Sequence, residues 1–165
     1  VLVLVGTTAT DLGGAHVTEL AGGILPGGTG EIPLLDLQAG PANAKAVARA
    51  IRTGSVCSAH DLSEGGLLVA AAEMGFAGRL GIELELDAVP GDSRNPMVTA
   101  FAETPSRYLL EVAPEHVDAV VAALADVPHA VVGRVHEDGV LRVSALGLEV
   151  SLDALRQRWL APLDW

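Results

Sequence analysis

The chain has 165 residues, a net charge of −11 at neutral pH and a pI near 4.7. This length suits one domain with its own core. A chain this acidic lacks the basic surface needed to displace the counterions of a nucleic acid or to bind an acidic membrane, so we expect neither partner. Hydrophobic residues make up 50% of the chain but aromatic residues only 3%, so aliphatic side chains must fill the core.

The single cysteine, Cys57, excludes an intrachain disulfide and fits a cytoplasmic protein. It falls in an apolar strand pattern at residues 55–59, which predicts a buried thiol. The apolar run at residues 1–5 is far shorter than the roughly 20 residues of a membrane span, and no basic segment precedes it. Because the chain opens with valine in a strand pattern, we expect it to be a piece of a longer protein.

Strand and helix patterns alternate along the first half of the chain. Residues 1–5 predict a buried strand, and the glycines and prolines of residues 22–30 predict a long surface loop. Residues 41–53 predict a helix, with Pro41 in its first turn and Gly54 after its end. A buried strand at residues 55–59 and a helix at residues 65–76 follow, with Ser63 as the helix N-cap.

The second half continues the alternation. Strands are predicted at residues 80–86, 108–112 and 146–150, and helices at residues 96–102, 114–124 and 152–159, the last capped by Ser151. Residues 129–136 and 140–143 predict a hairpin, since residues 137–139 (EDG) carry a turn signal. The whole chain, residues 1–165, therefore predicts one α/β or α+β domain with a mixed sheet covered by helices.

The most informative segment lies between the strand at residues 55–59 and the helix that follows. Gly65 and Gly66 permit either a positive φ or the close approach of a ligand, and backbone N–H groups at a helix start bind anions. Asp61, at the strand end, suits Mg²⁺, which usually takes one or two carboxylates plus phosphate oxygens. The alternative is that Asp61 and Ser63 only cap the helix.

Two further segments carry polar groups. Asp11, Gly13 and Gly14 form a turn after the first strand, where ligands of α/β sheets often bind, although such glycine pairs also serve plain turns. Residues 103–107 offer a carboxylate, two hydroxyls and a guanidinium, which suits a phosphorylated sugar but also a solvated loop. The histidines lack the spacing of zinc ligands, and we find no Ser-His-Asp or Walker-type pattern.

Four segments resemble the phosphoribosylformylglycinamidine synthase family of the purine pathway. Residues 58–68 (SAHDLSEGGLL) are similar to its His-Asp-x-Ser-x-Gly-Gly-Leu segment, and residues 101–107 (FAETPSR) to its Phe-Ser-Glu-Ser-x-x-Arg loop. Residues 10–14 (TDLGG) resemble its Glu-Leu-Gly-Gly turn, and residues 155–159 (LRQRW) its closing Leu-Arg-x-x-Trp helix. The segments follow the family's order along nearly the whole chain.

The resemblance implies a C-terminal domain of the aminoimidazole ribonucleotide (AIR) synthetase superfamily. The family is a ligase that converts formylglycinamide ribonucleotide, ATP and glutamine-derived ammonia into the amidine, ADP and phosphate. Implied cofactors are ATP and Mg²⁺, and implied partners are an N-terminal AIR-synthetase-related domain and a glutaminase domain or subunit. Alternatives are a noncatalytic packing module, or another ATP-dependent member of the superfamily such as a thiamine phosphate kinase or a hydrogenase maturation protein.

The resemblance also assigns site residues. It implies Asp61 as a Mg²⁺ ligand and no catalytic residue, and we expect no activity from these residues alone. The residues of the His-Asp-x-Ser motif and of the closing helix resemble those of the last domain of the duplicated family enzyme. The site of that domain serves an auxiliary nucleotide. The implied substrate or nucleotide contacts are Asp11, Gly13, Gly14, His60, Ser63, Glu64, Gly65, Gly66, Glu103, Thr104 and Arg107.

Overall fold

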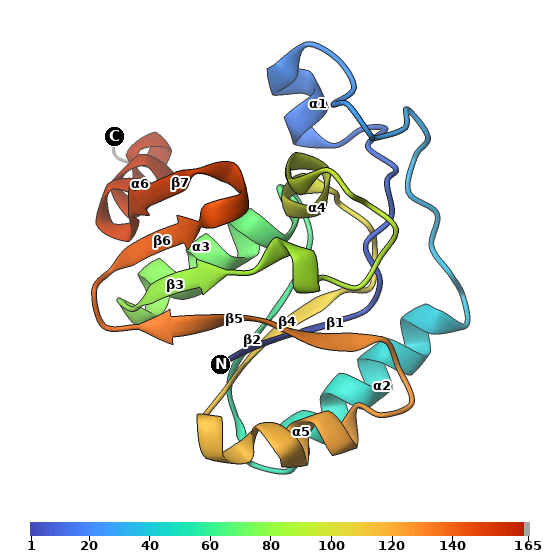
Figure 1. Ribbon diagram of the computed structural model, residues 1–165, viewed down its shortest axis with the longest axis vertical. Helices are drawn as coiled ribbons and strands as arrows, with labels where there is room; N and C mark the ends of the chain where they lie inside the picture. Colours follow the sequence, from blue (N-terminus) through green and yellow to red (C-terminus); the bar gives the residue numbers. More distant parts are fainter. Residues whose placement is uncertain (164–165) are drawn as a thin grey trace.

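A computed structural model describes residues 1–163 and contains one seven-stranded mixed sheet (Figure 1). The strand order is β2-β4-β1-β5-β3-β6-β7, and only the β3–β6 pair is parallel. The strands are β1 (Leu2–Val5), β2 (Val56–Asp61), β3 (Gly81–Leu84), β4 (Tyr108–Val112), β5 (His129–His136), β6 (Val140–Val143) and β7 (Leu148–Ser151). The predicted α+β class with a mixed sheet is confirmed.

Six α-helices accompany the sheet in the described residues. They are α1 (His16–Ala21), α2 (Ala39–Arg52), α3 (Gly66–Gly78), α4 (Pro96–Phe101), α5 (Val117–Ala123) and α6 (Leu152–Leu160). Short 3₁₀ turns occupy Leu86–Ala88, Pro114–His116, Ser144–Leu146 and Ala161–Leu163. Within residues 1–163, no helix is both long enough and apolar enough to cross a membrane.

Strand β1 separates two apolar cores. Leu2 and Leu4 face a core built with α3, β3, β6 and the start of α6, whereas Val3 and Val5 face a core built with α2 and α5. Successive side chains of a strand point to opposite faces, so a strand buried on both sides must be apolar at every position. This explains the uninterrupted run that predicted the strand, and all four β1 residues are fully buried.

Strand β2 lies at the edge of the sheet, so its predicted burial is wrong. It pairs with β4 alone, and most of its residues, including Cys57, are exposed. The predicted buried thiol is therefore wrong as well. A short run of small apolar residues is compatible with a central or an edge strand, because the difference depends on partners that lie far away in the sequence.

The predicted hairpin between residues 129–136 and 140–143 is also wrong. Both strands form, but β3 lies between them, antiparallel to β5 and parallel to β6. Gly81 lets β3 enter this position, since a Cβ there would stand 2.1 Å from the Asp138 carboxylate oxygen Oδ1. The turn chemistry is present, with Gly139 at φ 67°. A turn signal fixes the change in chain direction but not the pairing of the strands.

The helix termini test two predicted caps. The Ser151 hydroxyl accepts a hydrogen bond from the Ala154 N–H at 3.4 Å, which confirms the cap of α6. Ser63 does not cap α3, so that prediction is wrong. Gly65 is the N-cap, in the left-handed conformation with φ 76°, and the Ser63 carbonyl accepts from the Gly66 N–H at 3.1 Å. Helix α1, which was not predicted, buries only Val17.

Candidate functional site

The Glu103 side chain joins the three segments that the sequence singled out. Its carboxylate oxygen Oε1 accepts hydrogen bonds from the Gly65 N–H at 2.8 Å and from the His16 N–H at 3.1 Å. The turn after β1, the corner between β2 and α3, and the loop after α4 therefore meet. We call this arrangement the site wall, made of residues 11–16, 61–66 and 103–107. The structure thus brings together three segments that lie far apart in the sequence.

The Gly65 N–H group, which was predicted to bind a ligand anion, already has a partner in this structure. The Gly65 N–H at the start of α3 does meet an anion, but that anion is the carboxylate of Glu103. A negative charge there is favoured by the partial positive charge of the helix start. The chain thus fills part of its own anion site.

The buried side chain of Arg107 fixes the loop after α4 in place. This side chain is only 1% exposed and donates hydrogen bonds to the Thr104 carbonyl at 2.9 Å, to the Thr8 hydroxyl at 3.0 Å and to the Ala102 carbonyl. Burial lowers the pKa of Arg107 from its ordinary value to about 10, while the charge of Glu103 opposes this shift. The structure gives Arg107 a positioning role in place of the predicted ligand contact.

Thr104 also makes an internal contact. Its hydroxyl oxygen accepts a hydrogen bond from the Ala9 N–H at 3.0 Å, which ties the loop to the segment that follows β1. Asp11 behaves similarly, since its carboxylate accepts from the Thr29 hydroxyl at 2.9 Å. Both polar groups therefore stabilise the wall, and each oxygen keeps a second lone pair for another donor.

Two glycines of the wall are needed where segments of backbone come close together. A Cβ on Gly13 would stand 2.5 Å from the Gly30 carbonyl oxygen, and one on Gly66 would stand 2.5 Å from the Ala102 carbonyl oxygen. Close approach was predicted for Gly66, but the approaching group is the chain's own backbone. Gly14, with φ +79°, faces open space.

Substitution of Gly66 tests this close approach. Gly54 has a similar left-handed φ of +78° with nothing within 4 Å of a Cβ, so Gly54→Ala should cost only about 1 kcal/mol of unfolding free energy. Gly66→Ala adds a clash with backbone, which raises the expected loss to about 2 kcal/mol. Denaturant unfolding of the matched pair measures both losses. Equal losses would contradict the packing role of Gly66.

A groove of about 560 Å³ opens beside the wall. Gly65 and Glu64 line it, together with apolar side chains from α3 and α4: Val69, Met97 and Phe101. It is also lined by the carboxylates of Glu19 and Glu73. An acidic groove with apolar walls favours the hydroxyl, amino and ring groups of a ligand over its phosphates.

Sequence reasoning missed most of these groove residues. Gly65, Val69 and Glu73 are spaced four apart, so they share one face of α3. That spacing was the available signal. Phe101 begins the family-like segment at residues 101–107, but His16 and Met97, from α1 and α4, carried no signal, because their positions depend on tertiary packing.

His60 and Asp61 lie outside the groove lining. The His60 ring nitrogen Nε2 is 3.0 Å from a carboxylate oxygen of Glu73, and Nδ1 is 2.6 Å from the Asp61 carbonyl oxygen. The Asp61 side chain is 70% exposed. Within residues 1–163, no group of three His, Cys, Asp or Glu residues could hold a metal ion. One exposed carboxylate still fits Mg²⁺ that takes its other ligands from phosphates and water.

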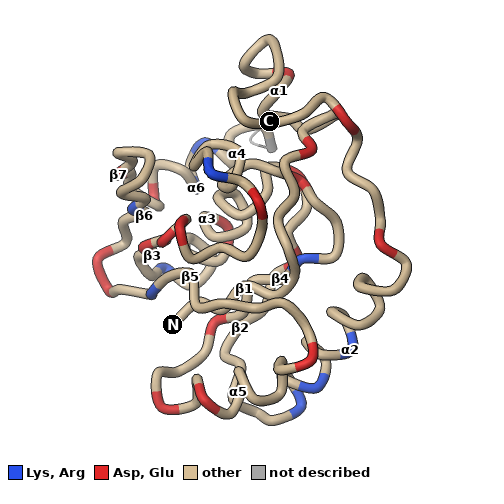
Figure 2. Tube along the Cα trace, turned by 45° about the vertical axis from the view of Figure 1, so that its right-hand side comes forward, with Lys and Arg blue, Asp and Glu red and all other residues tan. Residues whose placement is uncertain are grey.

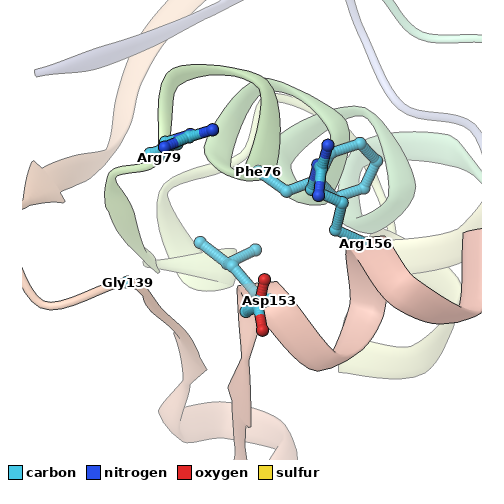
Figure 3. A pocket seen from close by; sticks show the side chains of 6 residues that line it. Phe76, Arg79, Gly139, Asp153 and Arg156 are labelled. Carbon is cyan, nitrogen blue, oxygen red and sulfur yellow. The ribbon is translucent and has the colours of Figure 1, made fainter.

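A second hollow lies at the opposite end of α3, where that helix meets α6 (Figure 3). Its volume is about 320 Å³, and Phe76, Arg79, Asp153 and Arg156 are among its lining residues. The Asp153 carboxylate accepts a hydrogen bond from the Gln157 side chain at 3.0 Å. None of the residues predicted for the site lies there, so the site wall remains the candidate site.

Comparisons with known proteins agree with the fold and the motifs. The family model described as "AIR synthase related protein, C-terminal domain" matches residues 1–145. The phosphoribosylformylglycinamidine synthase subunit PurL of Corynebacterium ammoniagenes is 32% identical over 98% of this chain and 20% of its own length. The corresponding subunit of Lacticaseibacillus paracasei is 40% identical over 81% of this chain and 16% of its own length. The chain thus spans about a fifth of these relatives.

Solved structures give the same result. Thermotoga maritima PurL complexed with FGAR superposes with a TM-score of 0.77 at 25% identity, over 93% of this chain and 27% of that one. E. coli HypE, a hydrogenase maturation protein, has a TM-score of 0.64 at 20% identity, over 92% of this chain and 48% of that one, and shows the fold alone. The chain belongs to the family of AIR synthase related proteins, as their C-terminal domain.

Proposed function

We propose that residues 1–165 form one domain of a phosphoribosylformylglycinamidine synthase. The whole enzyme would convert formylglycinamide ribonucleotide, ATP and glutamine-derived ammonia into the amidine, ADP and phosphate. The observation that carries the proposal is the meeting of three family-like segments at Glu103, beside an open groove. The naming of the relatives as PurL subunits supports the same reaction.

Different residues of this chain would bind the metal, contact the ligand and position the loop. Asp61 would hold Mg²⁺, which offsets the negative charge of ATP phosphates when bound. Glu64 and Glu73 would accept hydrogen bonds from hydroxyl or amino groups of the ligand, and Phe101 would contact its apolar surface. Arg107 positions the loop that carries Glu103 and Thr104.

The groove is open on one side, so a single domain would not enclose the ligand. We propose that an N-terminal AIR-synthetase-related domain closes it and that a glutaminase domain or subunit supplies ammonia. The chain alone would then bind nucleotide weakly and would not turn over substrate. The carboxylates of the groove would face the ligand's neutral groups while its phosphates lie toward Asp61 and the metal.

Asp61→Asn in the complete synthetase tests the metal role. Losing one carboxylate ligand should raise the Mg²⁺ concentration for half-maximal activity by about 10-fold or more. Asp118→Asn, at an exposed carboxylate of α5, which follows the end of β4 away from Asp61, is the matched control and should leave the Mg²⁺ dependence unchanged. Identical Mg²⁺ dependence in both variants would exclude Asp61 as a ligand.

One observation favours a second candidate, a noncatalytic packing module. Glu103 already occupies the Gly65 N–H that the sequence assigned to a ligand. Titration of the complete synthetase with Mg²⁺·ADP separates the two candidates. For a ligand-binding wall, Asp61→Asn weakens one binding event, whereas for a packing module it changes none.

A further inference from the structure

The connection between α1 and α2 exposes an unusual amount of apolar surface. Of the large hydrophobic side chains that are exposed in residues 1–163, most lie between residues 20 and 37. Ile32 is 72% exposed, Leu34 86% and Leu37 79%. We call residues 32–37 (IPLLDL) the apolar strap. In Figures 1 and 2 the connection that carries it runs along one side of the molecule, outside the helices and strands.

The backbone at the start of the strap is unpaired as well, whereas near its end the Asp36 carbonyl accepts from the Gly40 N–H at 2.9 Å. Within residues 1–163, no hydrogen bond joins the N–H or C=O groups of residues 32–35. The one charged side chain of the strap, Asp36, turns back to its own chain, where it accepts from the Gln38 and Ala39 N–H groups at 2.8 Å. The strap therefore exposes aliphatic side chains and unpaired amides, a combination suited to contact with another protein.

Both ends of the strap are fastened to the site wall. Before it, the Glu31 carbonyl accepts from the Gly13 N–H at 2.8 Å, in the turn after β1. After it, Asn43 of α2 donates to the Ser106 carbonyl at 3.0 Å, in the loop that carries Glu103. A body that covers the strap would therefore also border the wall and its groove.

Resting on the proposed function, we infer that the apolar strap is the docking surface for the neighbouring domain of the same synthetase. The partner is a folded domain with an apolar face, since the strap's outward side chains are aliphatic and its charge is used internally. About four fifths of each relative's length lies outside the matching region, so such domains exist in these proteins. A membrane is a poor partner for a chain of net charge −11.

Amide hydrogen exchange tests the inference. In the 165-residue chain the amides of residues 32–37 should exchange almost without protection, and in the complete synthetase they should slow by on the order of 100-fold or more. The double substitution Leu34→Gln and Leu37→Gln should abolish that protection. The matched control is Ile51→Gln, at a 46% exposed aliphatic residue of α2, which should leave the protection intact.

Two results would overturn the inference. One is equal exchange of the strap in the chain and in the complete synthetase. The other is a dimer of the 165-residue chain that the double substitution dissociates, because a second copy would then be the occupant. Ligase activity is measured separately. A complete protein without that activity contradicts the proposed function, while protection of the strap would still support docking.

Discussion

Arg107→Ala should destabilise the fold by about 3–5 kcal/mol, the largest loss that we expect from a single substitution in this chain. The guanidinium is buried, and the substitution leaves a cavity and deprives the carbonyls of Ala102 and Thr104 of their donor. Thr8 loses its partner too. Urea unfolding followed by circular dichroism gives the free-energy difference.

Two variants control this experiment. Arg94→Ala removes an exposed guanidinium and should change the unfolding free energy by less than about 0.5 kcal/mol. Arg107→Lys keeps the charge but loses the planar fork of donors, so its loss should approach that of alanine. A loss below about 1 kcal/mol for both Arg107 variants would show that the buried contacts are not what holds the loop.

The pH dependence of the Arg107 effect follows from its pKa of about 10 in the folded state, which is lower than its ordinary value in the unfolded state. Between pH 6 and 8 the side chain is protonated in the folded and the unfolded state, so the loss caused by alanine should be constant. Above about pH 10 the folded state loses this proton while the unfolded state still holds it, so the unfolded state binds more protons at this position. The contribution of Arg107 to the free energy of unfolding should therefore increase with pH in that range, which lies above the pH 6 to 8 of the unfolding measurement.

The elements that the sequence predicted well are those whose apolar residues follow a simple local pattern. Residues 108–112 match β4 in full, and the helix predicted at residues 41–53 differs from α2 by two residues at its start and one at its end. In these elements the side chains pack on the sheet in a simple period, which local sequence records directly. Ser151 was predicted for the same reason, since a cap acts within one turn.

The errors concern contacts between distant residues. Whether β5 pairs with β6 depends on where β3 inserts, and whether β2 is central or at the edge depends on which strands pair with it. The site shows the same limit. Glu103 and Arg107 are polar residues of one loop, yet the first closes the corner at Gly65 and the second is buried against Thr8 and Ala102. The sequence predicted which segments carry the polar groups, but not the direction of their side chains.

Glu103→Ala should cost about 3 kcal/mol of unfolding free energy, because it removes a charged acceptor that pairs two backbone N–H groups, those of Gly65 and His16. Glu103→Gln keeps an acceptor oxygen without the charge, so its loss should be smaller. Glu137→Ala, at an exposed carboxylate in the turn between β5 and β6, should have little effect.

The alanine variant should also gain an anion site. Once the carboxylate is gone, the Gly65 N–H at the start of the 13-residue helix α3 is open to sulfate or phosphate, which the helix dipole favours. Sulfate should therefore raise the melting temperature of Glu103→Ala more than that of the wild type or of Glu137→Ala. Equal shifts in all three proteins would mean that sulfate acts only through the bulk solvent, and that Glu103 does not occupy a latent phosphate site. A selective shift would instead mean that a ligand phosphate and Glu103 compete for the same N–H group, so phosphate binding in the synthetase would require the loop at residues 103–107 to move.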